Sequence, residues 1–596
     1  MTETLAQMFQ ESVEKFPELP ALMVKTEGAY TSITYRGMAQ KVRGLGRGFI
    51  ALGIQKKDHV ALLSESRPEW AISDMALVHI GAVNVALFPN IPASQVEYSL
   101  SDSGSGTLIV SDRTQLKKAM GIRDRLKYLR IIAMEPPPDG TADVLTFDEV
   151  LKLGEASPGT DAEFDERWKA VKPEDRASII YTSGTTGDPK GVILSHSNFV
   201  FNVKAGKHVL CFRPGEILLS FVPLNHVMGR FVDHYLPLSS GSTVAYVESL
   251  LKLRQNLQEI QPHYMLLVPR VLDMFREGIL AGMTKKSRRT QVIFHWALSA
   301  GKECCRLIES RQAIPLVTSF RWFLADRLVF RKIKNRLGLQ RLKFFFSGGA
   351  PLSRSTAEFF GAIRLRVMEG YGLSETAPLV TVNPSSLLKF GTVGLPLDGI
   401  EVKIADDSEI LVRGPNVMQG YHNRPEDTAE VIDSQGWFHT GDIGEFDGEG
   451  YLRITDRKKN LIVLSNGKKV APQPLENRLT ESPFIAHATV IGDQRNTITA
   501  LLFPSFKHLR DLAKEKKLDV DSDNNETLVS HPDIERLMKH EIDRLLPDLA
   551  DFEKIRRFSI VGEELSVENG TLTPTLKVRR RMVLERYKDA VEAMYR

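Results

Sequence analysis

Hydrophobic and polar positions follow two alternating patterns through the first two thirds of the chain. Short runs of β-branched and apolar residues recur between longer stretches with helical spacing, such as residues 67–79. This alternation predicts an α/β fold with largely parallel sheets, whose ligands usually bind beyond the carboxyl ends of the strands. The strand candidates are residues 60–63, 107–110, 131–134, 179–181, 217–222, 243–247, 265–268 and 343–346.

The pattern changes after about Gly391. Shorter β segments separated by turns follow at residues 399–404, 409–413 and 450–455, and they lead into a charged joint at residues 456–459. Beyond the joint the pattern is typical of a small α+β unit. We therefore predict a large N-terminal domain, 1–456, and a small C-terminal domain, 457–596.

A basic helical insertion is expected at about residues 280–340. Residues 285–343 contain fifteen Lys and Arg but three acidic residues, a local charge of +12. Two interpretations stay open: charges that simply face water, or a surface that contacts an anionic membrane. In the second, an apolar stripe at helical spacing would face the lipid, comprising Phe323, Phe330, Ile333 and Leu337, with Trp322 near it. The same stripe could equally pack against the large domain, in which case Trp322 and Phe323 are buried and the charges are solvated.

Composition excludes several classes of protein. A chain of 596 residues with 42% apolar residues can bury several cores, and its net charge of +4 (78 − 74) is too balanced for a dedicated nucleic-acid binder. The three cysteines, Cys211, Cys304 and Cys305, cannot build a disulfide framework, which fits a reducing cytosol. The N-terminus lacks the features of a secretory signal, and no window approaches the ~20 apolar residues of a membrane span. We expect a cytoplasmic protein, soluble or peripheral at the inner face of the membrane.

The strongest chemical signal is the loop Tyr-Thr-Ser-Gly-Thr-Thr-Gly-Asp-Pro-Lys-Gly-Val at residues 181–192. It follows a predicted strand and combines glycines, hydroxyl groups and Lys190. Backbone N–H groups, hydroxyls and a cation together can cradle a polyphosphate. The spacing differs from a Walker A loop, because Gly191 follows the lysine.

This loop resembles the phosphate-loop signature of the AMP-forming acyl-CoA synthetases, members of the adenylate-forming superfamily. Four further signatures follow in the family's order, so the resemblance covers nearly the whole chain. It implies a large domain of stacked α/β subdomains with a distorted β-barrel, and a small mobile C-terminal domain.

Two glycine-rich segments resemble the adenine site of that family. Residues 347–352 (Ser-Gly-Gly-Ala-Pro-Leu) directly follow a predicted strand, and residues 369–376 (Glu-Gly-Tyr-Gly-Leu-Ser-Glu-Thr) place glycines on both sides of Tyr371. Those glycines could lay the tyrosine ring against a purine, and Glu375 offers a hard carboxylate suited to Mg²⁺. By resemblance Tyr371 stacks on adenine, Glu375 holds Mg²⁺ and Thr376 contacts the α-phosphate.

Two segments near the C-terminal domain complete the resemblance. In residues 437–444 and 450–457, Asp442 could accept both ribose hydroxyls. The resemblance assigns the ribose to Asp442 and Arg457, and it makes Lys459 the hinge on which the small domain rotates. Lys577, after a Thr-Pro-Thr turn, matches the catalytic lysine that neutralises charge during adenylation.

The resemblance therefore predicts a full set of site residues. The catalytic candidates are Lys577, Lys190, Thr376 and His226. The metal candidates are Thr182 and Glu375. The ATP-binding candidates are Thr182, Ser183, Gly184, Thr185, Thr186, Gly187, Lys190, Gly349, Ala350, Pro351, Glu369, Gly370, Tyr371, Gly372, Leu373, Thr376, Asp442, Ile454, Arg457 and Lys577.

The sequence departs from the family at two positions. Relatives such as luciferase carry a second lysine four residues past the hinge, where this chain has Val463. Long-chain relatives often place an acidic residue three positions after the histidine, where this chain has Gly229. The resemblance therefore does not define the acyl pocket beyond His226, and two interpretations of His226 stay open: a substrate contact or a core histidine.

The resemblance implies an ATP-dependent acyl-CoA synthetase of the long-chain branch. It would use Mg²⁺ with ATP, a fatty acid and coenzyme A, forming acyl-AMP and then acyl-CoA. Three alternatives share some of these motifs: a free-standing ligase that loads a carrier protein, a luciferase-like oxygenase, and a non-catalytic lipid-binding scaffold. The presence of Lys190, Glu375, Asp442 and Lys577 argues against the scaffold.

Overall fold

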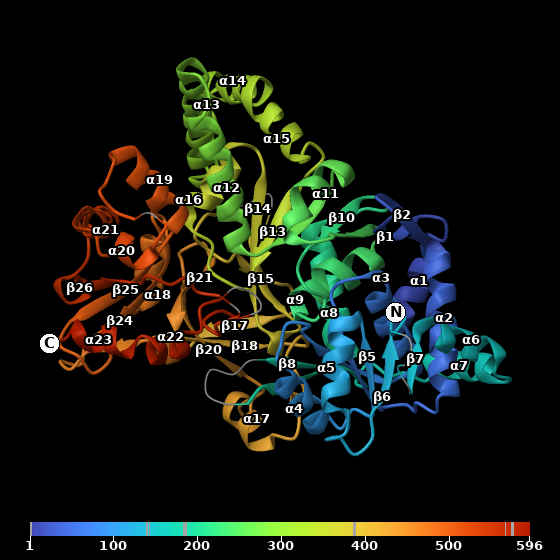
Figure 1. Ribbon diagram of the computed structural model, residues 1–596. Helices are drawn as coiled ribbons and strands as arrows, with labels where there is room; N and C mark the ends of the chain where they lie inside the picture. Colours follow the sequence, from blue (N-terminus) through green and yellow to red (C-terminus); the bar gives the residue numbers. More distant parts are fainter. Residues whose placement is uncertain are drawn as a thin grey trace.

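In the computed structural model, a large N-terminal part contains two big sheets, and a smaller C-terminal part lies beside it (Figure 1). The structure describes residues 3–138, 141, 143–182, 188–384, 389–521, 523–566, 568–573 and 577–596. All eight strands predicted from the sequence are present within one to three residues, and the helix expected at 67–79 is α3 (Pro68–Ile80).

The first large sheet is parallel at its centre and antiparallel at its edges. Its described strands run in the order β16 (Leu395–Pro396), β15 (Leu379–Val382), β14 (Arg366–Gly372), β13 (Phe344–Gly348), β12 (Tyr264–Leu267), β10 (Ile217–Ser220), β11 (Thr243–Tyr246), β1 (Pro20–Thr26) and β2 (Ala29–Thr34).

The second large sheet follows the same plan, with five parallel pairings and an antiparallel edge. Its described strands run in the order β19 (Gly420–Tyr421), β9 (Lys190–Ser195), β8 (Arg176–Thr182), β4 (Val83–Leu87), β3 (His59–Leu63), β5 (Thr107–Val110), β6 (Arg130–Ala133) and β7 (Val144–Thr146).

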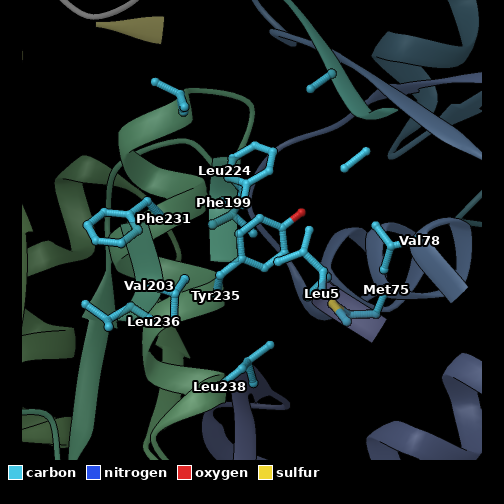
Figure 2. Packing of buried hydrophobic residues seen from close by; sticks show 14 of the residues in the cluster. Leu5, Met75, Val78, Phe199, Val203, Leu224, Phe231, Tyr235, Leu236 and Leu238 are labelled. Carbon is cyan, nitrogen blue, oxygen red and sulfur yellow. The ribbon is translucent and has the colours of Figure 1, made fainter. Parts of the chain in front are cut away.

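Both sheets are covered on both faces, which explains why their strands read as continuous apolar runs. In β13, Phe344 and Phe346 enter the core between the sheets, whereas Phe345 enters the core on the outer face, because successive strand residues point to opposite sides. The core between the sheets contains α1 (Leu5–Lys15), α2 (Tyr35–Ala51), α3 and α8 (His196–Leu210). Figure 2 shows α1, α3 and α8 residues packing there against residues 224–238.

Helices also cover the outer faces. The first sheet is covered by α11 (Leu253–Ile260), α12 (Pro269–Thr284), α13 (Arg288–Glu309) and α16 (Arg354–Ala362). The second is covered by α4 (Ala93–Ser103) and α5 (Arg113–Arg123). Two further helices, α6 (Phe147–Ala156) and α7 (Thr160–Lys169), pack against α2.

The short β segments predicted after Gly391 lie in an antiparallel sheet of β17 (Glu401–Ile404), β18 (Glu409–Arg413), β20 (Phe438–Phe446) and β21 (Leu452–Arg457). The C-terminal part has its own core around β24 (Ile485–Ile491), β25 (Ile498–Pro504) and β26 (Ile555–Ile560). That core is covered by α18 (Pro472–Leu479), α19 (Phe506–Lys516) and α21 (Pro532–Leu545), and the chain ends in α22 (Arg580–Arg586) and α23 (Lys588–Ala593).

The basic insertion is helical, as expected: α13 is followed by α14 (Leu316–Ala325), the π-turn η3 (Asp326–Phe330) and α15 (Arg331–Leu337). At three of its four positions the apolar stripe follows the core-packing interpretation, whereas Phe323 is 46% exposed. Phe330 is fully buried, and Ile333 and Leu337 pack against the same outer core. The indole of Trp322 donates to the carbonyl oxygen of Ala362 at 2.9 Å. The pattern was helical, but its apolar side faces the large domain. No helix among the described residues has the length and apolarity to cross a bilayer.

A buried ion pair joins α3 and α9 (Val227–Arg230) within the helical core to the second sheet. The Arg230 guanidinium, at the end of α9, donates to Asp74 Oδ1 of α3 at 2.7 Å, and both side chains are fully buried. Asp74 also accepts hydrogen bonds from Asn84 at 2.6 Å and Tyr235 at 2.7 Å. Burial alone would raise the pKa of Asp74, but Arg230 and the hydrogen bonds from His234 and Asn84 hold it below its usual value.

Breaking this pair should destabilise the large domain strongly. We expect Arg230→Met to lower the free energy of unfolding by about 3–5 kcal/mol, because it leaves the Asp74 carboxylate buried without its cation. Adding Asp74→Asn should recover part of that loss. Denaturant unfolding of the two single variants and the double variant measures the coupling.

The matched control is Arg413→Met, which breaks an exposed pair with Glu401 at 2.7 Å. This variant should lower the free energy of unfolding by less than about 1 kcal/mol. Strictly additive losses for Asp74→Asn and Arg230→Met would contradict a coupled pair.

Candidate active site

The two glycine-rich signatures lie side by side at the carboxyl ends of adjacent parallel strands. Residues Ser347 and Gly348 of β13 pair with Glu369 and Gly370 of β14, so both loops leave the same edge of the sheet. Gly349 has a φ of +79°, and Ala350 and Pro351 are exposed at the rim. The predicted adenine wall is therefore an open turn beside Tyr371.

One hydrogen-bonded trio links the glycine-rich segment 369–376 to the segments 437–444 and 450–457. Asp442 of β20 accepts from the Tyr371 hydroxyl at 2.8 Å and from Arg457 Nε at 2.9 Å. The register of β20 and β21 puts Asp442 directly opposite Arg457. The negative charge of Asp442 is the main cause of the raised pKa of Arg457. Ile454, three residues earlier on β21, is half-buried against the central core.

A second chain of contacts connects the phosphate loop to Glu375. Lys190 opens β9 opposite Thr182, and its Nζ lies 5.1 Å from the centre of the Tyr421 ring. The Tyr421 hydroxyl donates to Glu375 Oε1 at 2.9 Å. Lys190 also pairs with Asp427 of α17 (Pro425–Val431) at 3.1 Å. Tyr421 thus lies between the loop lysine and the proposed metal carboxylate.

The residues after Tyr371 form a tight turn. A Cβ on Gly372 would lie 1.7 Å from the carbonyl oxygen of Pro378, so only glycine fits there. The Thr376 hydroxyl is fully buried and donates to that same oxygen at 2.6 Å, while it accepts from the Leu373 N–H at 2.9 Å. The Thr376 hydroxyl therefore stabilises the turn. Glu369, at the start of the same segment, is also buried, and burial raises the pKa of its carboxyl to about 8.

His226 is positioned by the loop that precedes α9. Asn225 donates to the Ser64 carbonyl oxygen and accepts from the Trp70 indole, both at 2.7 Å, which fixes the loop to the second sheet. His226 Nδ1 accepts from the Met228 N–H at 3.2 Å. Burial, followed by the nearby Lys577 ammonium, lowers the pKa of His226 to about 3, so the imidazole is neutral at physiological pH.

The unusual glycine after this histidine has a steric cause. A Cβ on Gly229 would lie 2.3 Å from the carbonyl oxygen of Pro223. Backbone atoms cannot yield as a flexible side chain can, so the acidic residue expected from relatives does not fit this turn.

Lys577 reaches the site from the C-terminal part. Removal of its ammonium group from water, followed by repulsion from Arg457, lowers the pKa of Lys577 to about 8, although attraction to Asp442 opposes this. The residue as a whole is exposed, and its ammonium is close enough to Arg457 and Asp442 for their charges to affect the pKa of Lys577, as its own charge affects the pKa of His226.

The joint between the two parts is short. Lys458, in η5 (Lys458–Asn460), is held to the four-stranded sheet by Asp407 at 2.6 Å and Glu409 at 2.9 Å. Ile462 already belongs to the core of the C-terminal part. Lys459 is exposed between these two anchors, where a pivot would be placed.

The donor set suits a cation that arrives with phosphate. In the portion of the chain with described coordinates, no three His, Cys, Asp or Glu side chains gather to hold a metal. Glu375 is a largely desolvated carboxylate whose pKa is raised by burial, and a cation would relieve that cost. Mg²⁺ commonly takes one or two protein ligands and completes its shell with water and phosphate. Glu375 fits that need. The Thr182 hydroxyl, the other predicted ligand, lies at the end of β8 and donates to the carbonyl oxygen of Lys190 at 3.4 Å.

Some expectations fall outside the described residues, and some contacts were missed. Ser183, Gly184, Thr185, Thr186 and Gly187 lie in a segment that the structure leaves undescribed. Sequence reasoning overlooked Tyr421 and Asp427, because one tyrosine and one aspartate in a turn-rich segment carry no periodic or glycine-rich signal. Tyr421 pairs with Val192 of β9, a strand rich in β-branched and apolar residues, and this strand was the one sequence signal near it.

Comparison with solved structures shows the fold. The adenylation domain of a carboxylate reductase from Mycobacterium chelonae superposes with a TM-score of 0.75 at 22% identity, covering 99% of this chain and 91% of that one. A fatty acyl CoA synthetase from Mycobacterium tuberculosis superposes with a TM-score of 0.63 at 21% identity, covering 99% of both chains.

Sequence comparison reaches further. The protein is 33% identical to a long-chain-fatty-acid–CoA ligase, FadD15, of Mycobacterium bovis over 100% of this chain and 97% of that one. It is 30% identical to the long-chain-fatty-acid–CoA ligase ACSBG1 of Bos taurus, over 99% of this chain and 85% of that one. The model of the AMP-binding enzymes matches residues 9–422, and that of their C-terminal domain matches residues 459–596. The chain therefore belongs to the AMP-binding enzyme family.

Proposed function

We propose that the protein is an AMP-forming long-chain fatty acid–CoA ligase. The observation that carries the proposal is the hydrogen-bonded Tyr371–Asp442–Arg457 trio. Lys577, from the C-terminal part, supports it, because the charges of Arg457 and Asp442 act on its ammonium. The family supplies adenylation chemistry, and relatives of 28–33% identity over almost the whole chain carry this ligase's name. We place the protein in the cytoplasm as part of this proposal.

In the first half-reaction a carboxylate oxygen of the fatty acid attacks the α-phosphorus of ATP. The bond from that phosphorus to the bridging oxygen breaks, and pyrophosphate leaves with the electron pair. Asp442 accepts the ribose hydroxyls, Tyr371 faces the adenine, and Lys190 reaches the outer phosphates. Lys577 neutralises charge on the attacking carboxylate and α-phosphate, which is where charge stabilisation lowers the barrier. Mg²⁺ at Glu375 and Thr182 would supply further positive charge to the phosphates.

In the second half-reaction the thiol of coenzyme A attacks the acyl carbonyl and expels AMP, while the thiol proton passes to solvent. The C-terminal part rotates about Lys459 between the steps, which removes Lys577 and opens the site to the thiol. The two anchors on either side of Lys459, Lys458 and Ile462, support a pivot of this length.

A direct assay tests the whole proposal. With Mg·ATP and free coenzyme A, the protein should convert saturated fatty acids to thioesters and release AMP. The ratio kcat/KM should rise with chain length, because each buried CH₂ adds about 0.8 kcal/mol. AMP release that requires a carrier protein instead of coenzyme A would favour the carrier-loading alternative. Absence of both products would overturn the proposal.

Lys577→Ala should separate the half-reactions. We expect acyl-AMP formation to fall by about 10²–10³-fold, the range for losing one group that stabilises transition-state charge. Thioester formation from supplied acyl-AMP should stay close to the wild-type rate. Single-turnover measurements of each step decide this, and an equal loss in both would remove Lys577 from its role.

The pH dependence of adenylation should report the lysine directly. The free enzyme holds the Lys577 ammonium at a pKa of about 8, so kcat/KM for ATP should decline as pH rises through that value and the charge is lost. Lys577→Arg keeps its charge over this range, so its profile should stay flat. An identical alkaline decline in both proteins would assign the titration to another group.

A further inference from the structure

Helix α14 exposes large apolar side chains on one side. The exposed fractions are 89% for Leu316, 70% for Val317, 60% for Phe320 and 46% for Phe323. Leu316, Phe320 and Phe323 are spaced by four and three residues and lie on one face of the helix, with Val317 at its margin. Thr318 and Ala325 on the other side are buried. These four exposed residues form the apolar face of α14, and a face of this kind is unusual on a surface that meets only water.

Cations follow this face directly along the chain. Arg327, Arg331 and Lys332 are exposed in η3 and at the start of α15. The first of them lies four residues after Phe323, which is the spacing of neighbours on one helical face. Positive charge therefore continues where the apolar residues end.

The acidic residues of the insertion do not offset this charge outward. Asp326 is 10% exposed and lies 2.7 Å from Lys334 and 3.4 Å from Arg331. Glu309 is bound to Arg354 of α16 at 2.5 Å. Glu303 accepts from the Thr318 hydroxyl at 3.2 Å and pairs with Arg321 at 3.5 Å, with both side chains of the pair 39% exposed. These three acids face fifteen cations in residues 285–343, so the insertion keeps a large net positive charge.

We propose that the apolar face of α14 inserts into an anionic lipid bilayer, while Arg327 and Lys332 contact the headgroups. Apolar side chains beside cations on an exposed helix match the arrangement of interfacial helices. Lys and Arg near an anionic leaflet add to the attraction. Figure 1 shows α13, α14 and α15 projecting together at the outer end of the large part, where a flat surface can approach them.

The docking is independent of catalysis, but its benefit rests on the proposed function. A long-chain fatty acid partitions into the bilayer, so a docked ligase meets its substrate at high local concentration. The surface that docks belongs to the insertion and includes none of the residues assigned to the nucleotide site.

Vesicle co-flotation of the full chain tests this surface. The protein should bind vesicles of phosphatidylcholine with phosphatidylserine, bind phosphatidylcholine alone much less, and release as salt rises. The double variant Phe320→Ser/Phe323→Ser and the double variant Arg327→Gln/Lys332→Gln should each lose on the order of tenfold in affinity.

Matched controls use exposed residues elsewhere. Leu251→Ser removes an apolar side chain that is 94% exposed, and Arg113→Gln/Lys117→Gln removes two exposed cations on α5. Both should bind vesicles like the wild type. All variants should keep the wild-type melting temperature and the wild-type rate with a fatty acid presented without vesicles, which separates failed docking from failed catalysis.

Two outcomes would overturn the proposal. Equal binding by the wild type and both test variants would place the lipid contact elsewhere or show that there is none. A dimer in sedimentation velocity that Phe320→Ser/Phe323→Ser dissolves, without vesicle binding, would show that a second copy of the chain covers this face.

Discussion

The buried ion pair between Asp74 and Arg230 is the constraint on which the geometry of the site depends. Arg230 ends the helix that begins just after His226, and its guanidinium also donates to the Ser178 hydroxyl of β8. The same strand ends at Thr182, one of the residues proposed to bind the phosphates. One fully desolvated charge pair therefore joins the segment that carries His226 to the strand that carries Thr182. A carboxylate and a guanidinium in a dry core tolerate little displacement, because each depends on the other for its solvation.

The polar groups of the proposed nucleotide site hold one another in place in a similar way. Asp442 is oriented from two directions by Tyr371 and Arg457, and Glu375 is oriented by Tyr421. A carboxylate whose orientation is already fixed needs little reorganisation when a ligand arrives, which is the source of catalytic advantage in preorganised sites. These partners come from segments that are far apart in the chain, so their arrangement depends on the tertiary fold.

Much of this could be predicted from sequence because the signals were local. Apolar runs predicted β3, β10 and β13, and the glycine-rich segments gave the loops after β13 and β14. The orientation of one helical stripe stayed open. The stripe containing Phe330, Ile333 and Leu337 had the right period, but periodicity cannot tell which neighbour an apolar face meets. Tyr421 and the Asp74 network were missed because they depend on contacts between residues far apart in the chain, such as the 156 positions between Asp74 and Arg230.

The location of Lys577 on the C-terminal part has a consequence for the direction of the reaction. Attack of pyrophosphate on acyl-AMP passes through the same transition state as its formation and needs the same ammonium group. In the proposed cycle the lysine leaves when the domain turns, so the return path loses its cation just as the thiol gains access. Domain rotation then makes the first step effectively one-way: once Lys577 has left, the adenylate reacts onward to the thioester faster than pyrophosphate can convert it back to ATP.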